Sequence, residues 1–147
     1  MNVYTIGFTK KTAEQFFTSL KNNRIDILID IRLNNTSQLA GFTKFPDIEF
    51  FLARVCNIEY IHDELLAPTE EILKAYKNKQ INWSKYVEQF NALMILREIT
   101  THIKKRYTTL QTKNICLLCS EDKPEKCHRS LIAPFFAELT HASVINL

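Results

Sequence analysis

The sequence predicts an α/β fold: a single Rossmann-like domain in which helices cover both faces of a mostly parallel sheet, giving a three-layer sandwich. Short strand-like apolar runs alternate with amphipathic helical segments, which is typical of strands joined by crossover helices. Two of the runs, 25–31 and 115–119, have the apolar character expected of parallel strands buried on both faces. The 147 residues contain no repeat or linker, so we expect one domain spanning 1–147.

The first half of the chain contains three predicted strands and two predicted helices. Residues 3–7 form a β-branched and aromatic run that predicts the first strand. Thr12 and Gln15 match a capping box, and the apolar stripe behind them predicts a helix that ends near 22–23. The next elements are predicted as a strand at 25–31, a helix that starts near 46–47 and includes 50–56, and a weaker strand at 58–61.

The second half is richer in helix. Thr69 can cap a helix with two glutamates in its first turn. A longer helix is expected from Asn82, with an apolar stripe that continues to Ile103. We interpret Trp83 and Tyr86 of this stripe as core residues rather than as a platform on which bases stack. The last elements are predicted as a strand at 115–119, a helix at 129–139 and a strand at 143–147.

The composition indicates a globular protein of a reducing compartment. Hydrophobic residues make up 46% of the chain and charged residues 24%, which is typical of a folded domain. No apolar run approaches the roughly 20 residues that cross a bilayer, and the first residues do not resemble a secretion signal. We therefore expect a cytoplasmic protein without membrane contact, whose four cysteines are thiols or metal ligands. The net charge of +3 gives only weak support for a nucleic-acid partner.

Polar residues follow three of the predicted strands at their carboxyl ends. These ends are residues 5–7, 30–32 and 119–121. In an open parallel sheet, ligands bind beyond the carboxyl ends of the strands. We therefore expect the three segments to meet at one edge of the sheet and to form a shared site.

Asp30 and Arg32 are the first candidates at this edge. They lie two residues apart in a strand, so their side chains leave the same face of the sheet. Asp30 can accept a proton or bind a cation, and Arg32 can hold a phosphate or carboxylate through two parallel hydrogen bonds. An internal ion pair that fixes the following loop is the alternative. Gly7, after the first strand, would permit the close approach of a ligand or of another backbone segment.

The stretch NICLLCSEDKPEKCHRSL, residues 114–131, is the densest in reactive groups. It contains three of the four cysteines and one of the four histidines. Cys127, His128 and Arg129 lie at or just before the start of a predicted helix, where free amide groups favour anions. The same position and the neighbouring positive charges would favour a thiolate at Cys127.

The residues leave three interpretations of this stretch open. In the first, Cys119 or Cys127 is a nucleophile, with His128 or Asp30 as acid or base. In the second, Cys119, Cys127 and His128 bind zinc, with Asp30 or a water as the fourth ligand. The spacing differs from common structural zinc sites, and adjacent side chains tend to diverge. In the third, the thiols belong to the core and Arg129 alone binds an anion. Two further cysteines are expected in the core: Cys56 and Cys116.

The chain resembles the DUF488 family over nearly its whole length. The matching stretches are Thr5 to Gly7, Asp30 to Arg32 with Ser37 after it, LAPTEEILKAYK at 66–77, Trp83 to Tyr86, and above all LLCSEDKPEKCHRSLIA at 117–133. The resemblance implies a Rossmann-like α/β domain without an established activity. The family's hallmark positions correspond here to Thr5, Gly7, Asp30, Arg32, Cys119, Glu121, Cys127, His128 and Arg129. Many relatives have His-Ser where this chain has Phe8 and Thr9, and a proline where it has Asn34 and Asn35.

These observations favour a site that binds an anionic small molecule, such as a nucleotide or another phosphate compound, and that can be catalytic. The residues expected in catalysis are Asp30, Cys119, Glu121, Cys127 and His128, and those expected to bind the ligand are Thr5, Gly7, Arg32, Ser37 and Arg129. The alternative is an accessory domain that binds nucleic acid or protein, in which the Cys-His-Arg loop is structural or binds zinc. The sequence leaves the reaction, the cofactor and the oligomeric state open.

Overall fold

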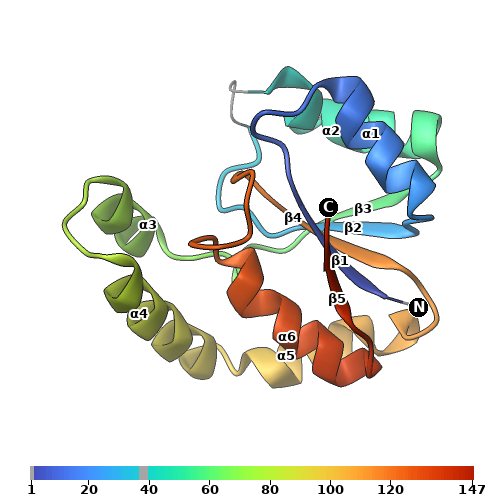
Figure 1. Cartoon of the computed structure of the whole chain (residues 1–147). Coiled ribbons are helices and arrows are strands. Elements are labelled where there is room, and N and C mark those ends of the chain that lie inside the picture. Colours follow the sequence, from blue (N-terminus) through green and yellow to red (C-terminus); the bar gives the residue numbers. More distant parts are fainter. Residues whose placement is uncertain (1, 37–39) are drawn as a thin grey trace.

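In the part of the chain that the structure describes, one sheet of five parallel strands organises the fold. A computed structural model describes residues 2–36 and 40–147. The sheet has the order β3-β2-β4-β1-β5 (Figure 1), and every pair of neighbouring strands is parallel. The strands are β1 (Val3–Gly7), β2 (Ile27–Asp30), β3 (Glu59–His62), β4 (Ile115–Cys119) and β5 (Val144–Asn146). The predicted α/β class with a parallel sheet is confirmed.

Helices cover both faces of this sheet and give the three predicted layers. In Figure 1, α1 and α2 lie on one side of the strands, and α5 and α6 lie on the other. The helices are α1 (Ala13–Asn22), α2 (Asp47–Phe51), α3 (Glu70–Lys77), α4 (Trp83–Leu96), α5 (Ile99–Tyr107) and α6 (Arg129–Thr140). Helix α2 continues into a π-helical turn, Leu52–Cys56. Short 3-10 turns are formed by Gly41–Thr43, Glu64–Leu66 and Thr108–Leu110.

The alternation of side chains along the buried strands divides the core in two. In β4, Ile115 and Leu117 pack with α4, α5 and α6, whereas Cys116 and Leu118 pack with α1 and α2. A strand buried on both faces needs apolar residues at every position, and this is why 115–119 is almost entirely apolar. The two predicted core cysteines follow the same division, since Cys116 is buried and Cys56 packs at the edge of the α1–α2 cluster.

The helical region 82–107 differs from the prediction of one long helix. The chain forms two helices, because α4 ends at Leu96 and Glu98 adopts a left-handed backbone conformation with φ 49°. The apolar stripe nevertheless continues across the break, and Phe90, Met94, Ile99 and Ile103 belong to one core cluster. Helices α3 and α4 extend from the sheet as an arm, residues 68–96 (Figure 1).

Among residues 2–36 and 40–147, no helix combines the length and the apolar character that crossing a bilayer requires.

Candidate functional site

The carboxyl ends of three central strands meet at one edge of the sheet, as predicted. Gly7 of β1 is paired with Cys119 of β4. On the other side of β4, the amide of Ile31 donates to the carbonyl of Leu118 over 3.1 Å. Segments that are about a hundred residues apart in the sequence are therefore neighbours here.

Gly7 and Arg129 together hold the loop that follows β4. A Cβ atom added at Gly7 would overlap the carbonyl group of Glu121 and would lie 2.6 Å from Nη1 of Arg129. The predicted close approach at Gly7 is thus to another backbone segment. The buried guanidinium of Arg129 donates from Nη1 to the carbonyl of Glu121 and from Nη2 to the carbonyl of Asp122, the latter over 3.0 Å. A cavity opens at this edge of the sheet, and Arg129 is not among the residues that line it.

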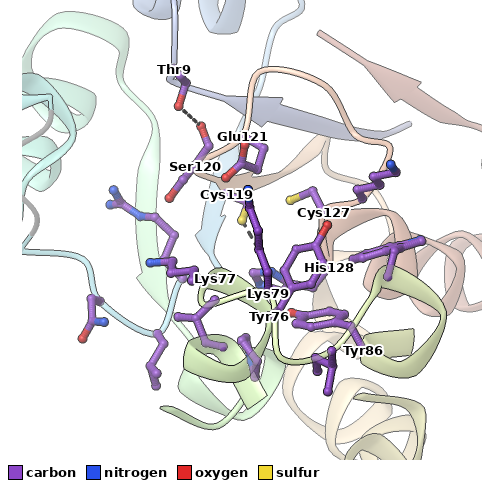
Figure 2. Close-up of a pocket in the computed structure, with 18 of the residues that line it drawn as sticks. Thr9, Tyr76, Lys77, Lys79, Tyr86, Cys119, Ser120, Glu121, Cys127 and His128 are labelled. Carbon is purple, nitrogen blue, oxygen red and sulfur yellow. Dashed lines mark hydrogen bonds between the residues drawn. The ribbon is translucent and has the colours of Figure 1, made fainter. Parts of the chain in front are cut away.

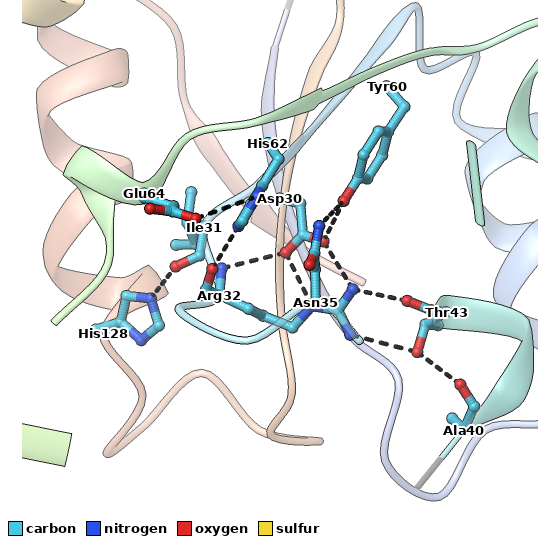
Figure 3. A network of polar contacts seen from close by, with 10 residues as sticks. All are labelled: Asp30, Ile31, Arg32, Asn35, Ala40, Thr43, Tyr60, His62, Glu64 and His128. Atoms are coloured by element: carbon cyan, nitrogen blue, oxygen red, sulfur yellow. Dashed lines mark hydrogen bonds and ion pairs between the residues drawn. The ribbon is translucent and has the colours of Figure 1, made fainter. Parts of the chain in front are cut away.

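Asp30 and Arg32 form a buried ion pair, with 0% and 3% of their surfaces exposed. Oδ1 of Asp30 accepts from Nε and from the backbone amide of Arg32, over 2.8 and 3.1 Å. Oδ2 accepts from Nη2 of Arg32 and from the Tyr60 hydroxyl, each over 2.7 Å (Figure 3). Burial tends to lower the pKa of Arg32, but the hydrogen bond and the charge of Asp30 outweigh it and raise that pKa. The geometry is that of the internal ion pair, which fixes the loop after β2.

Of two other predicted ligand residues, one lies away from the reactive groups and the other lies outside the residues that the structure describes. Thr5 is fully buried, and its hydroxyl donates to Oδ1 of Asn146 over 2.6 Å, so it joins β1 to β5. Ser37 lies outside the described residues. Glu121, in contrast, is exposed and lines the cavity at the sheet edge.

Cys119, Cys127 and His128 form a cluster of reactive side chains at the end of β4 and the start of α6 (Figure 2). Their exposed fractions are 6%, 3% and 6%. Sγ of Cys119 lies 3.5 Å from Nδ1 of His128. Nε2 of His128 lies 2.7 Å from the carbonyl oxygen of Ile31. A carbonyl can only accept, so Nε2 is the donor of this contact, and Nδ1 is the ring nitrogen that faces Cys119.

The two thiols are also in contact with each other. A hydrogen bond from Cys127 is the main reason why the pKa of Cys119 is lowered, and the charge of Arg129 adds to this effect. The same hydrogen bond raises the pKa of Cys127, and burial raises it further. Negative charge therefore develops first on Cys119. The cluster can supply a thiolate beside an imidazole, or it can supply soft donor atoms to a metal ion, because the three donor atoms lie within 4.8 Å of one another.

A cavity of about 1030 Å³ opens over this cluster. Cys119, Cys127 and His128 form its floor. The rest of the lining comes mainly from the α3–α4 arm and from the loops after β2 and β4. A cavity of this size lies at the upper end of the range typical of small-molecule sites.

Three aromatic side chains of the arm form one wall of the cavity: Tyr76, Trp83 and Tyr86. The rings of Trp83 and Tyr86 are stacked, with centroids 5.0 Å apart and an interplanar angle of 15°. The centroid of Tyr76 lies 5.1 Å from that of Tyr86. As predicted, Tyr86 is buried in the core, but it and Trp83 also line the cavity. Sequence reasoning missed Tyr76 and the cationic residues beside it, since nothing in the sequence shows which face of the arm turns toward the sheet.

Comparison with models of protein families identifies the family of the chain. The model of the family described as domain of unknown function DUF488 matches residues 12–136. The chain belongs to the DUF488 family. No curated protein and no solved structure matches it. The matched part of this DUF488 chain contains the Asp30–Arg32 pair and the whole cluster at the cavity floor, whereas Thr5 and Gly7 precede it.

Phe8 and Thr9, which follow β1 in this DUF488 chain, have structural roles. Phe8 is buried, and the guanidinium of Arg32 lies 5.3 Å from the centroid of its ring. The Thr9 hydroxyl donates to the carbonyl of Ser120 over 2.6 Å, and Thr9 lines the cavity. Both residues therefore support the loops around the cavity.

Proposed function

We propose that this chain binds an anionic small molecule with a planar ring system, of the nucleotide type, and acts on it at the Cys119–Cys127–His128 cluster. The observation that carries the proposal is the cavity at the sheet edge, in which an aromatic wall and cationic side chains surround a reactive floor. Ligands of parallel α/β domains bind at this edge. A concave site also argues for a small molecule rather than for the flat surface expected of an accessory domain.

The charges of the cavity favour an anion. Among the described residues that line it, the cations are Arg32, Lys77, Lys79 and Lys126, and the acid is Glu121. Arg32 is neutralised by Asp30. The three lysines are exposed, and no ion pair between them and the other described residues is present. They are therefore available to a phosphate or carboxylate group.

The aromatic wall favours a planar ring in the same ligand. Tyr76 and Trp83 are only partly buried, so part of each ring is open to the cavity. Stacking of a base on such rings contributes about 1–3 kcal/mol per base. A nucleotide combines the ring and the anionic group that the two features would recognise.

Glu121 is the acid or base that this arrangement supports best. Its exposed carboxyl group lies in the cavity lining, two residues after Cys119. Asp30, the other predicted candidate, uses both of its oxygens in hydrogen bonds to Arg32 and Tyr60. Within the proposed function, Asp30 positions the loop and Glu121 moves protons.

Trp83 provides the test, because it is the only tryptophan of the chain and it lines the cavity. We expect adenosine monophosphate to change its fluorescence on binding, and to bind more tightly than inorganic phosphate, which lacks the ring. In the Lys77→Gln/Lys79→Gln variant, we expect the Kd of the nucleotide to rise about tenfold, since two charge-assisted contacts are lost.

A matched double variant, Lys74→Gln/Lys85→Gln, serves as the control. It also removes two positive charges. Lys74 of α3 and Lys85 of α4, however, pair with Glu70 and Glu88 on the exposed surface. Its Kd should stay within about twofold of the wild-type value, since exposed pairs contribute little. A Trp83 signal that does not respond to the nucleotide, or equal Kd values for the two double variants, would contradict the proposal.

A further inference from the structure

We propose that Cys119, Cys127 and His128 bind a zinc ion at the floor of the cavity and leave its fourth position open to the ligand. The metal site follows from the geometry of the cluster alone. Only the use of the open position rests on the proposed function.

The distances within the cluster fit tetrahedral zinc. Zinc binds sulfur at about 2.3 Å and nitrogen at about 2.0–2.1 Å, so a sulfur and a nitrogen on one tetrahedral ion lie about 3.6 Å apart. Sγ of Cys119 lies 3.5 Å from Nδ1 of His128. The sulfur of Cys127 lies within 4.8 Å of both other ligand atoms. The three atoms are therefore near enough to one another to share one ion.

The backbone explains how two adjacent residues, Cys127 and His128, point to one place. Lys126 adopts a left-handed conformation with φ 59°, and the amide of Cys127 donates to the carbonyl of Pro124 over 3.1 Å. This turn directs Cys127 back toward the end of β4. His128 has the helical angles φ −63° and ψ −16°, and Nδ1, the nitrogen nearer to its own backbone, faces Cys119. The divergence of adjacent side chains, which argued against zinc in the sequence, is thus overcome.

The surroundings of His128 are those of a metal ligand. Zinc-binding histidines commonly donate their second ring N–H to a carbonyl or carboxylate, which fixes the tautomer and the orientation of the ring. Here Nε2 donates to the carbonyl of Ile31 over 2.7 Å (Figure 3). The ring of Phe90, with its centroid 5.7 Å from that of His128, supports the imidazole from the core side.

Zinc would use all three side chains of the cluster as ligands. In a Cys–His catalytic pair only Cys119 would react, and Cys127 would serve only as a hydrogen-bond donor to it. Two thiolates and one imidazole are a donor set that prefers zinc among the common divalent ions of cells. A site with three protein ligands beside a cavity has the form of catalytic zinc sites, in which the fourth position takes water or substrate. Glu121 lines the same cavity and is not a ligand, which suits the general acid or base of such a site.

Metal analysis of the full chain, purified without chelators and without a metal-binding tag, tests the proposal. We expect about one zinc per chain in the wild-type protein and at least a fivefold loss in Cys119→Ser and Cys127→Ser, because a site that loses one of three ligands binds far more weakly. Cys56→Ser is the matched control, since this cysteine lies near α1 and outside the cluster. Its zinc content should equal that of the wild type.

A second measurement covers variants that fail to fold. Cobalt exchanged into the wild-type protein should give the thiolate charge-transfer absorption and the intense visible bands of a tetrahedral site. Chelation should then make two additional thiols reactive toward a thiol reagent in the native state. Zinc well below one per chain, zinc content unaffected by Cys119→Ser, or a disulfide between Cys119 and Cys127 in freshly purified protein would overturn the proposal.

The same samples separate this inference from the proposed function. The Lys77→Gln/Lys79→Gln variant should keep its zinc while its affinity for the nucleotide falls. A protein that binds the nucleotide but lacks zinc would overturn only the metal site. A protein with stoichiometric zinc and no response to the nucleotide would overturn only the proposed ligand.

Discussion

Gly7 shows how one residue can determine the shape of the cavity floor. The carbonyl group of Glu121 and the guanidinium of Arg129 occupy the space that a side chain at this position would need. The absence of a Cβ lets the loop after β4 pass directly beside β1. Cys119, the residue paired with Gly7, is thereby held at the base of the cavity.

Gly7→Ala should therefore destabilise the protein strongly. The added methyl group would force the 120–122 loop away from β1, and overpacking of this kind costs about 1–3 kcal/mol or more. Urea unfolding measures the change. The other glycine of the chain, Gly41, is the control, since a Cβ there meets no atom within 4 Å and Gly41→Ala should change stability by less than about 1 kcal/mol. Equal effects of the two substitutions would show that the close approach at Gly7 is not a constraint.

The Asp30–Arg32 pair acts on the site through the backbone. Its hydrogen bonds, together with one from Nη2 of Arg32 to the carbonyl of Thr43 over 2.7 Å, fix the loop after β2. The carbonyl of Ile31, which accepts from His128, belongs to that loop. Asp30, predicted as an acid, and Arg32, predicted as an anion ligand, thus orient the imidazole of His128 by fixing this loop.

At the scale of elements, the α3–α4 arm carries the aromatic wall, and polar contacts define its ends. The Thr69 hydroxyl caps α3 by accepting from the amide of Ile72 over 3.2 Å. The side chain of Asn82 caps α4 by accepting from the amide of Lys85 over 2.8 Å. At the far end of α4, Arg97 donates to carbonyls in the segment after β3, which returns the arm to the sheet.

Helix α5 is attached to the same segment through Asp63. Oδ2 of this buried carboxylate accepts from the Tyr107 hydroxyl over 2.6 Å and from Nε2 of His102 over 2.8 Å, and it lies 3.4 Å from Nη1 of Arg106. Burial works to raise the pKa of Asp63, but these hydrogen bonds and charges outweigh it and lower the pKa below 3.8. The carboxylate form is thus more favoured in the folded state than in the unfolded one.

This shift predicts a specific dependence of stability on pH. A group whose pKa is lower in the folded state stabilises the fold above its unfolded pKa, here 3.8, and this contribution is lost as the pH falls through the folded value. Urea unfolding between pH 2 and pH 7 should show the loss in the wild type and a smaller loss in Asp63→Asn. At pH 7 the variant should be less stable by about 1–3 kcal/mol.

Glu88→Gln, which changes an exposed carboxylate on α4, is the control for that measurement and should keep the wild-type pH dependence. An Asp63→Asn protein with an unchanged acid dependence would show that the Asp63 network does not contribute to it.

At the scale of the whole molecule, the topology gathers the site from distant parts of the chain. Strands β2, β4 and β1 are adjacent in the sheet, so residues 7, 31 and 119 become neighbours. Much of this could be predicted from the sequence, because apolar runs such as 115–119 identify buried parallel strands and the carboxyl ends of such strands share one edge. The capping box of Thr12 and Gln15 could also be predicted, because its pattern involves only residues close together in the sequence.

Features that depend on long-range packing could not be predicted in this way. Neither glycine nor proline marks the break at Glu98 between α4 and α5, so the helical spacing indicated one long helix. Arg129 resembled an anion ligand because it stands at the start of a helix, but its partners are carbonyls of a loop that folds over it. The helical spacing of Trp83 and Tyr86 predicts core residues only, and nothing in the sequence marks Tyr76, because the orientation of the arm follows from tertiary contacts alone.

The most direct test of the account asks whether the proposed ligand and the reactive cluster share one cavity. In chelator-treated protein, the rate at which iodoacetamide alkylates Cys119 is measured by peptide mass spectrometry, with Cys56 as the internal control. The account predicts that adenosine monophosphate at ten times its Kd, determined from Trp83 fluorescence, slows alkylation of Cys119 about tenfold and leaves Cys56 unchanged. Alkylation of Cys119 at the same rate with and without the bound nucleotide would contradict it.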